Sequence, residues 1–524
     1  MKKTNVLLFL LVVAIAASLF AGGGSAGGSS GGSGGPTPIT LSWASRPVFD
    51  PELPSVQEIM RLTNTTVQVV LSENTVDSRN LMFASGDLPD IIQMTGLDFL
   101  QYLSTGYFRP LDDLLPTYAP NIWKNTSADG WKFMTVQGKI YAYPYEANRI
   151  KHYAYVRSDW LDNLGIDLSR NQDYGNFGGK VITVDEYRDI LIKFTRNDPD
   201  KNGRNDTYGM GATARKTNFD WNNIYGAFGG IPGHYYEANG RVIPWIVTDQ
   251  YRQGLQYLNS LWREGVIDPE IFLNNNDQAR QKMINSVSGS VVGEWWSSAH
   301  TLQVDGLQAL VPDAEFIPIW LTSNDGKTFG SPDNGLISNT WSISTTSKNP
   351  EKALSFCDFF NDDAGYYWAW YGLEGLDYTM VDGYPQRTEA GLTKYNNMVI
   401  DPFFSLSNRL DLQNRAARRP VFNWTELLRQ KWEILQHDNS QPSYASIFYG
   451  IPSPVAYGEY GVDVNNWIEQ SAMAFITGET PLTDANWNNY INTWRRMGGV
   501  RILQGYIDSY NSINGTRLTA GITE

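Results

Sequence analysis

The 524-residue sequence contains one cysteine and four histidines, which narrows the chemistry that it can perform. Cys357 cannot form a disulfide within the chain, and the helical pattern around it predicts a buried, inert thiol. The histidines show no His-Glu-x-x-His motif and no Cys/His spacing, so a zinc site has little support. The sequence also shows neither a Ser/His/Asp order nor a phosphate-binding loop.

Clusters of basic residues are equally scarce. The net charge is −14, the isoelectric point is near 4.9, and no basic run is longer than Arg418-Arg419 or Arg495-Arg496. Because nucleic-acid binding depends on concentrated positive charge, nucleic acid is not expected as a partner. The acidic balance also mildly disfavours strongly anionic sugars as ligands, although the local potential at a site can override it.

The one long apolar run lies at the start of the chain. Two lysines precede an apolar stretch over residues 6–17, which predicts a secretory signal over residues 1–21 and an exported protein at the cell surface or in the periplasm. A flexible Gly/Ser tether follows over residues 22–38. Residues 19–22 resemble a bacterial lipoprotein signal, but glycine stands where the acylated cysteine would be. The protein is therefore expected to be released, to keep its signal as a short anchor, or to have been altered at this point.

The most chemically explicit stretch runs from Asn197 to Gly209. Oxygen-bearing side chains at alternate positions, with a glycine at the sharp turn, are typical of a loop that wraps Ca²⁺. Gly209 stands where an EF-hand has its bidentate Glu, so water, Thr207 or a carboxylate from elsewhere must complete the site. The expected ligands of this structural calcium site are Asp198, Asp200, Asn202, Arg204 through its carbonyl, Asp206 and Thr207. The same composition also suits a solvated surface turn without a metal.

Aromatic residues are abundant, with 18 Trp and 29 Tyr, and some are expected to line a surface where ring faces meet a ligand. The length calls for two or three domains. From residue 39 on, strand and helix patterns alternate, which predicts an α/β fold. Predicted strands cover residues 39–43, 66–71, 88–94, 152–156, 288–296 and 337–344, and predicted helices cover 55–63, 159–164 and 249–264.

A series of motifs runs through the whole mature chain. They include Ser-Gly-Asp-Leu-Pro-Asp-Ile-Ile at residues 85–92, Gly-Lys-Ile-Tyr at 138–141, Val-Arg-Ser-Asp-Trp-Leu-Asp-Asn-Leu-Gly at 156–165, Glu-Gly-Val-Ile-Asp-Pro at 264–269 and Tyr-Gly-Leu-Glu-Gly at 371–375. Ten such motifs, in order, resemble the extracellular solute-binding proteins of bacterial ABC transporters, family 1, in particular the lipoproteins of the LipO kind. No single motif is decisive, but their order is strongly specific.

This resemblance implies a type II periplasmic-binding-protein fold, with two discontinuous α/β lobes, a hinge and a ligand cleft between them. The expected lobe 1 comprises residues 39–150 and 338–384, and the expected lobe 2 comprises 151–337 and 385–524. The resemblance further implies a monomer without catalytic activity that closes around an oligosaccharide or similar polar solute and delivers it to the permease subunits of an ABC importer. In alginate-oligosaccharide-binding relatives, the calcium loop is structural.

The ligand residues are expected among aromatic and polar side chains, because a sugar offers a C–H face to a ring and hydroxyls to polar groups. Trp295 and Trp296 follow a predicted strand, where the resemblance places a stacking tryptophan, and at least one is favoured as a ligand contact over core packing. Glu374 could accept sugar hydroxyls, but a role in ordering its own loop is slightly favoured. The remaining candidates, weighed against core packing or an exposed loop, are Tyr145, Trp221, Trp341, Tyr371, Trp43 and Arg46.

Two other functions remain open from the residues. A secreted glycoside hydrolase would also need aromatic residues and a carboxylate pair, and sequence alone cannot place two carboxylates at a set separation. An adhesion or scaffold protein at the cell surface is the third alternative. The identity of the solute is not predicted.

Overall fold

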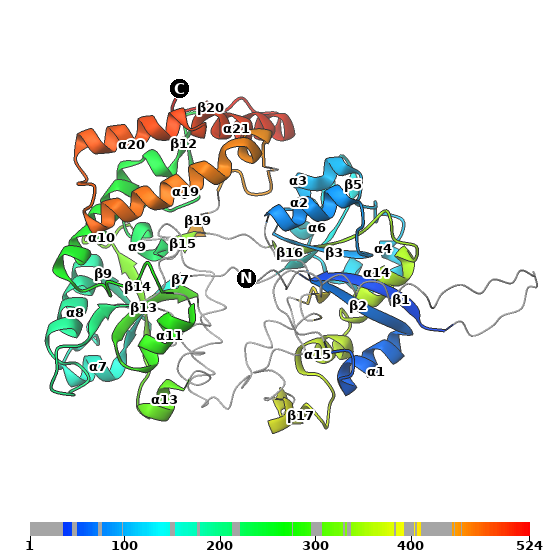
Figure 1. Ribbon diagram of the computed structural model, residues 1–524, viewed down its shortest axis with the longest axis horizontal. Helices are drawn as coiled ribbons and strands as arrows, with labels where there is room; N and C mark the ends of the chain where they lie inside the picture. Colours follow the sequence, from blue (N-terminus) through cyan, green and yellow to red (C-terminus); the bar gives the residue numbers. More distant parts are fainter. Residues whose placement is uncertain are drawn as a thin grey trace, which may run out of the picture.

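The computed structural model divides into two lobes, each with its own hydrophobic core (Figure 1). Lobe 1 is built around buried residues between Ile39 and Tyr143 and between Ile337 and Leu406. Lobe 2 is built around buried residues between Ala154 and Leu321 and between Phe448 and Ile507. The structure describes residues 35–43, 50–71, 76–96, 98–146, 152–174, 179–211, 221–274, 276–294, 306–328, 331–332, 337–381, 384–391, 403, 406–409, 443–444, 446–451 and 453–523.

Lobe 1 is organised by a five-stranded sheet in the order β2-β1-β3-β16-β6. Strand β1 pairs in parallel with β2 and β3, whereas β16 pairs antiparallel with β3 and β6. Strand β16 belongs to the second passage of the chain through this lobe, so the sheet is assembled from distant segments. The strands are β1 (Thr37–Trp43), β2 (Thr65–Leu71), β3 (Ile91–Thr95), β6 (Tyr143–Glu146) and β16 (Ile337–Ile343).

Helices and two hairpins complete lobe 1. The helices are α1 (Pro54–Thr63), α2 (Val76–Ser85), α3 (Phe99–Tyr102), α4 (Leu115–Tyr118), α5 (Pro120–Asn125), α6 (Ala128–Met134), α14 (Pro350–Phe359) and α15 (Asp363–Tyr371). The hairpins are β4 (Thr135–Val136) with β5 (Lys139–Ile140), and β17 (Tyr378–Val381) with β18 (Tyr384–Arg387). Cys357 is fully buried on α14, as predicted, and burial raises the pKa of its thiol to about 12.

Lobe 2 contains a six-stranded mixed sheet in the order β10-β13-β7-β14-β9-β8. Strand β7 pairs antiparallel with β13 and β14, while β10 is parallel to β13 and β9 is parallel to β14. The strands are β7 (His152–Arg157), β8 (Asp173–Tyr174), β9 (Gly179–Thr183), β10 (Tyr208–Met210), β13 (Ser288–Glu294) and β14 (Phe316–Thr322).

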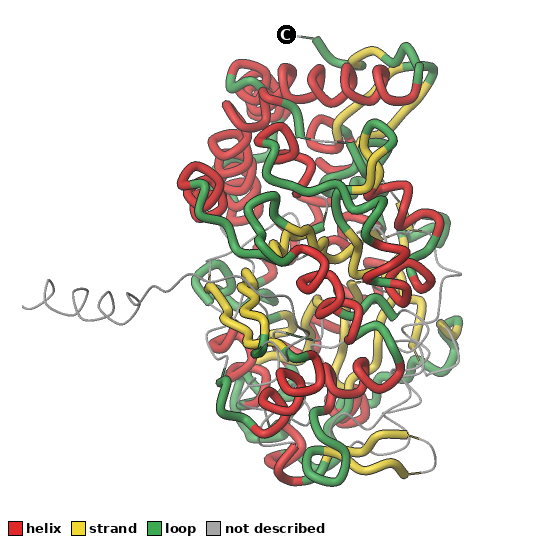
Figure 2. The backbone as a smooth tube through the Cα atoms, turned by 90° about the vertical axis from the view of Figure 1, so that its right-hand side faces the viewer, coloured by secondary structure: helices red, strands yellow, loops and turns green. Residues whose placement is uncertain are grey.

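The helices of lobe 2 come from both halves of the chain. They are α7 (Ser158–Asn163), α8 (Val184–Arg196), α9 (Asn222–Gly226), α10 (Asp249–Glu264), α11 (Asn276–Ile284), α13 (Leu307–Leu310), α19 (Val455–Thr477), α20 (Asp484–Arg496) and α21 (Gly499–Asn514). A small sheet joins β11 (Tyr235–Ala238), β12 (Arg241–Pro244) and β20 (Thr519–Ala520), and β15 (Ser331–Pro332) pairs with β19 (Ser443–Tyr444). Figure 2 shows the helices and strands of the chain after a turn of 90° about the vertical axis of Figure 1.

Local signals in the sequence fix the ends of the longer helices. Thr183 accepts a hydrogen bond from the backbone N–H of Glu186, and Glu186 accepts one in return, which forms a capping box at the start of α8. Thr248 caps α10 in the same position, and Gly265 ends that helix in the left-handed conformation. The predicted helix over residues 249–264 is therefore observed with the same bounds.

The register of the strands orients both sheets toward the segments that connect the lobes. In lobe 1, β6 ends at Glu146 opposite Ile337, the first residue of β16, and the parallel strands β1, β2 and β3 end at this same edge. In lobe 2, β13 ends at Glu294 opposite His152, the first residue of β7, and β9, β10 and β14 end beside it. Since the chain crosses between the lobes from residue 146 to 152 and from 332 to 337, the carboxyl edges of both sheets adjoin the crossings.

One segment beyond residue 384 packs with lobe 1. The prediction assigns everything after residue 384 to lobe 2, but Phe403 and Leu406 are fully buried in the core of lobe 1. Phe403 stacks on Phe360 of lobe 1, with ring centroids 5.2 Å apart. The chain therefore contributes to lobe 1 for longer than its sequence pattern indicates.

The helices in the described part of the chain include none with the length and hydropathy of a membrane span.

Gly289, the second residue of β13, provides a test of packing in lobe 2. A Cβ atom at residue 289 would lie 2.2 Å from Cε3 of Trp160 and 2.4 Å from Cδ2 of Phe194, so a methyl group has no room. We expect Gly289→Ala to lower the free energy of unfolding by about 1–3 kcal/mol, measured by urea unfolding followed through tryptophan fluorescence.

Gly458→Ala is the matched control. A Cβ atom at Gly458, within α19, meets nothing within 4 Å, so alanine should leave stability unchanged or raise it by up to about 1 kcal/mol. Equal stabilities for the two variants would contradict the close packing at Gly289.

Candidate functional site

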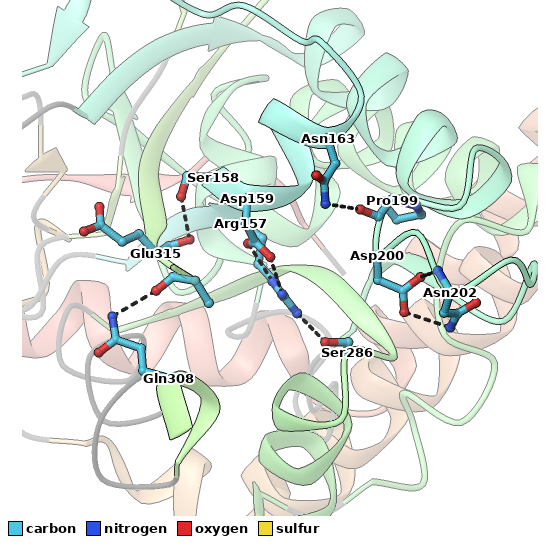
Figure 3. Close-up of polar contacts among 11 residues, drawn as sticks. Arg157, Ser158, Asp159, Asn163, Pro199, Asp200, Asn202, Ser286, Gln308 and Glu315 are labelled. Carbon is cyan, nitrogen blue, oxygen red and sulfur yellow. Dashed lines mark hydrogen bonds and ion pairs between the residues drawn. The ribbon is translucent and has the colours of Figure 1, made fainter. Parts of the chain in front are cut away.

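The predicted cation loop folds around Asn202. The side-chain amide of Asn202 donates to Asp200 over 2.9 Å (Figure 3). The same amide donates to Asp206 over 3.1 Å. Asp198 accepts hydrogen bonds from the backbone N–H groups of Asn202 and Gly203, at 3.0 and 2.9 Å. Three carboxylates are thereby gathered by two adjacent residues of one short loop. Gly203 has a φ of +81°, which is the conformation that the sharp turn requires.

The electrostatics of the loop fit a cation. Burial, a hydrogen bond with Asp198 and the charge of Asp206 raise the pKa of Asp200, because neighbouring carboxylates destabilise one another when ionised. Asp and Asn oxygens are the donors that Ca²⁺ prefers. Across the described residues, however, no three or more His, Cys, Asp or Glu side chains already have the arrangement of a metal site. The carboxylates would therefore have to shift locally to coordinate calcium.

Thr207 and Arg204 make hydrogen bonds within the fold that the sequence pattern did not predict. The Thr207 hydroxyl is buried and donates to the carbonyl of Phe194, over 2.7 Å, so its side chain is used to join the loop to the end of α8. The backbone N–H of Arg204 donates to Oδ1 of Asn202, over 2.8 Å. The Thr207 hydroxyl is thus already bonded, whereas the Arg204 carbonyl, the atom expected to bind the cation, takes no part in this contact.

A hydrogen bond also connects the cation loop to α7 (Figure 3). The Asn163 side chain, at the end of α7, donates to the carbonyl of Pro199 over 2.9 Å. At the start of α7, Arg157 is buried, pairs with Asp159, and donates to Ser286 over 2.7 Å. The loop immediately precedes β10, so it lies at the amino edge of the lobe 2 sheet, opposite the edge that adjoins the crossings.

The carboxyl edges that adjoin the crossings are the candidate ligand site, since α/β sheets bind ligands beyond the carboxyl ends of their strands. Tyr145, on β6, lies at this edge of lobe 1 and is 8% exposed. Burial raises the pKa of its hydroxyl, which stays protonated. Trp43 is the last residue of β1 at the same edge. Arg46, Trp295 and Trp296 lie outside the described residues.

The remaining aromatic candidates are packed inside the lobes. Trp221 is fully buried in the core of lobe 2, with its ring 6.1 Å from that of Phe272. Trp341 is fully buried in the core of lobe 1. Tyr371 is 2% exposed, and the Arg387 guanidinium lies 4.7 Å from its ring centroid. These positions favour the core-packing alternative for all three tyrosine and tryptophan side chains.

Glu374 is exposed, and a different acid orders its loop. The buried carboxylate of Asp377 accepts from the backbone N–H of Leu373 over 2.8 Å. Gly372 has a φ of +86°, and a Cβ there would lie 2.3 Å from the same carboxylate. The loop role that sequence reasoning favoured for Glu374 thus belongs to Asp377.

A buried polar network fastens the end of β6, where the first crossing begins. The Glu146 carboxylate accepts from the backbone N–H and hydroxyl of Ser127 and from the amide of Asn408. Asn408 also accepts from the backbone N–H of Glu146 over 2.8 Å, and its own N–H donates to Asn361 over 2.7 Å. Residues 262 positions apart in sequence therefore hold the base of the crossing.

Adjacent residues of the segment 446–451 pack against opposite lobes. Phe448 stacks on Tyr506 of lobe 2, with ring centroids 5.3 Å apart. Tyr449 packs edge-on against Phe133 of lobe 1, with centroids 4.9 Å apart, and its hydroxyl accepts from the backbone N–H of Ile337 over 3.1 Å. This segment therefore links the two lobes independently of the crossings at 146–152 and 332–337.

Sequence reasoning missed two polar residues in the first turn of α9. Asn222 and Asn223 are 2% and 3% exposed, although asparagine is usually a surface residue. The run Asp-Trp-Asn-Asn at residues 220–223 carries a signal for this pair, two adjacent asparagines directly after a tryptophan.

Comparisons with known proteins agree with this architecture. The chain is 23% identical to the polygalacturonan/rhamnogalacturonan-binding protein YtcQ of Bacillus subtilis, over 97% of this chain and 99% of that protein. The structure of alginate-binding protein AlgQ2, solved without calcium ion, matches with a TM-score of 0.68 and 21% identity, over 91% of this chain and 99% of that one. FusA of S. pneumoniae, solved with kestose and also as an EF-hand mutant, matches with a TM-score of 0.68 and 18% identity, over 91% and 100%.

The structural matches confirm the predicted two-lobe α/β fold. The family itself is established by sequence: residues 55–367, more than half of the chain, match the family model for bacterial extracellular solute-binding proteins. The resemblance that the ordered motifs indicated is therefore confirmed, and the chain belongs to the bacterial extracellular solute-binding protein family.

Proposed function

We propose that this protein is an exported receptor for an oligosaccharide, held between the two lobes and delivered to the permease subunits of an ABC importer. The observation that carries the proposal is the register of the two sheets, which brings both carboxyl edges to the same crossings. A solute that contacts both edges would stabilise the closed arrangement of the lobes, and that arrangement would be the form that docks on the permease.

The relatives support a carbohydrate ligand. YtcQ is named for polygalacturonan and rhamnogalacturonan, AlgQ2 for alginate, and FusA was solved with kestose. These ligands share a chain of hydroxyl-rich rings but differ in charge, so both neutral and acidic oligosaccharides are candidates. A monomeric receptor without catalytic activity is the simplest form of this function, and binding without cleavage distinguishes it from a glycoside hydrolase.

Binding can be tested directly with the purified protein. Isothermal titration with kestose, trigalacturonate and alginate trisaccharide should give saturable heat and a raised melting temperature for at least one sugar, because a ligand that binds only the folded state stabilises it. Chromatography after overnight incubation should recover that sugar intact. Cleaved product would overturn the receptor function in favour of a hydrolase, and no binding to any sugar would count against a carbohydrate receptor.

Trp295 and Trp296 remain our proposed stacking residues, because they follow β13 directly and that strand ends at the carboxyl edge of lobe 2. We expect Trp295→Ala or Trp296→Ala to weaken sugar binding at least about tenfold, or 1.4 kcal/mol, with a smaller effect on unfolding. Trp123→Ala is the control for the loss of an exposed tryptophan, because Trp123 is 43% exposed on α5. Unchanged affinity in both variants would place these rings outside the site.

We also propose that the loop from Asp198 to Asp206 binds a structural Ca²⁺. The converging carboxylates and the raised pKa of Asp200 support this, as do the calcium-related structures of AlgQ2 and FusA. Because the loop lies at the amino edge of the sheet, its calcium would fasten α8, α7 and β10 rather than touch the solute.

Calcium removal should therefore lower stability and spare binding. At a free calcium concentration 100 times Kd, a single site adds about 2.7 kcal/mol to the free energy of unfolding, which EDTA should remove. Protons compete with calcium at Asp200, whose pKa is raised, so the stabilisation should shrink as the pH falls. Scanning calorimetry of wild type, Asp200→Ala and the surface control Asp325→Ala measures this. An EDTA-insensitive melting temperature in wild type would rule out the metal.

A further inference from the structure

The first turn of α9 holds a buried amide group that no other part of the described chain satisfies. Among the described residues, neither the nitrogen nor the oxygen of the Asn223 side chain has a hydrogen-bond partner, and the side-chain oxygen of Asn222 is likewise unpaired. Both residues are almost fully buried, at 3% and 2% exposed. We infer that Asn223, with Asn222 beside it, is a contact residue of the solute site that recognises sugar hydroxyls.

Other buried asparagines in the protein show what a structural amide looks like. Asn361 donates to the carbonyls of Cys357 and Leu406, over 2.9 and 3.0 Å, and accepts from the N–H of Asn408. Asn274, in lobe 2, donates to Asp268 over 3.2 Å. Because burying an unpaired polar group destabilises the fold, buried amides are almost always bonded in this way. Asn223 departs from that rule at both of its amide atoms.

The position of α9 indicates what could satisfy this amide. The helix follows β10, whose carboxyl end lies at the edge of lobe 2 that adjoins lobe 1. It packs against β7, β14 and β15. Strand β7 begins after the first crossing, β15 ends where the second crossing starts, and β14 ends beside the start of β7. Figure 1 shows α9 beside β15 on the inner side of lobe 2. The unpaired amide therefore belongs to the part of the fold where the solute is proposed to bind, and the inference rests on that proposed function.

The chemistry of the side chain narrows the ligand group. A carboxamide offers one acceptor and a pair of donors without net charge, which matches two neighbouring hydroxyls of a sugar ring. A sugar carboxylate would instead favour arginine or lysine as its partner. We therefore assign to α9 the recognition of a hydroxyl edge, a feature that neutral and acidic oligosaccharides share.

A stability measurement distinguishes this role from a structural one. Asn223→Leu, which is nearly isosteric, replaces the unpaired amide with apolar atoms, so the melting temperature of the sugar-free protein should stay the same or rise by a few degrees. The affinity for kestose or trigalacturonate, whichever wild type binds, should fall at least tenfold. Asn223→Ala, which adds no methyl groups, should weaken binding in the same way.

Asn274→Leu is the matched control in the same lobe. It removes a bonded amide, so it should lower the melting temperature and leave the affinity unchanged. A loss of melting temperature for Asn223→Leu as large as for Asn274→Leu would show that Asn223 has a structural partner, such as a buried water, and would overturn the inference. Wild-type affinity in both Asn223 variants would also overturn it. Failure of wild type to bind any of the sugars would instead refute the proposed function itself.

Discussion

The antiparallel pairing of β16 with β3 and β6 is the constraint on which the arrangement of lobe 1 depends. Strand β16 enters from the crossing and runs against its neighbours, so those neighbours must end where β16 begins. The pairing of β7 with β13 and β14 imposes the same geometry on lobe 2. Each lobe thus presents the ends of its strands to the other because of hydrogen-bond register, and a ligand site between the lobes is a consequence of topology before any side chain is considered.

The connections between the lobes must hold that geometry and still permit closure. On the lobe 1 side, the buried residues Glu146 and Asn408 are hydrogen-bonded to each other at the end of β6, so the base of the first crossing is stiff. Phe448 and Tyr449 act differently, because Phe448 packs against three tyrosines of lobe 2 whereas Tyr449 packs against Phe133 of lobe 1. Aromatic contacts tolerate small rotations better than a buried carboxylate network does. Closure of the lobes would therefore leave the end of β6 fixed and be accommodated more easily at these aromatic contacts.

The elements were predictable from sequence because their signals are local. The bounds of α10 follow from a threonine cap and a terminal glycine, and the strands of both sheets follow from short apolar runs. Membership of a core is not local, which is why Trp221 and Trp341 looked like ligand residues and why Phe403 was assigned to the wrong lobe. A tryptophan has the same sequence signature in a core as on a binding surface, and only its long-range neighbours decide between them. The asparagines of α9 were missed for the converse reason, since they stand out only through their burial.

The two proposed sites would assign stability to one edge of the lobe 2 sheet and solute recognition to the other. At the amino edge, polar groups are paired: Arg157 with Asp159, Asn163 with the carbonyl of Pro199, and the loop carboxylates with Asn202. At the carboxyl edge, Asn223 is buried with its amide unpaired. A fold can tolerate such a group only where other interactions supply enough stability, and sequences commonly accept local destabilisation at functional sites. A calcium ion at the loop, as proposed, would be useful to a binding protein without touching its solute, because stability added at one edge would permit unsatisfied polar groups to be kept at the other.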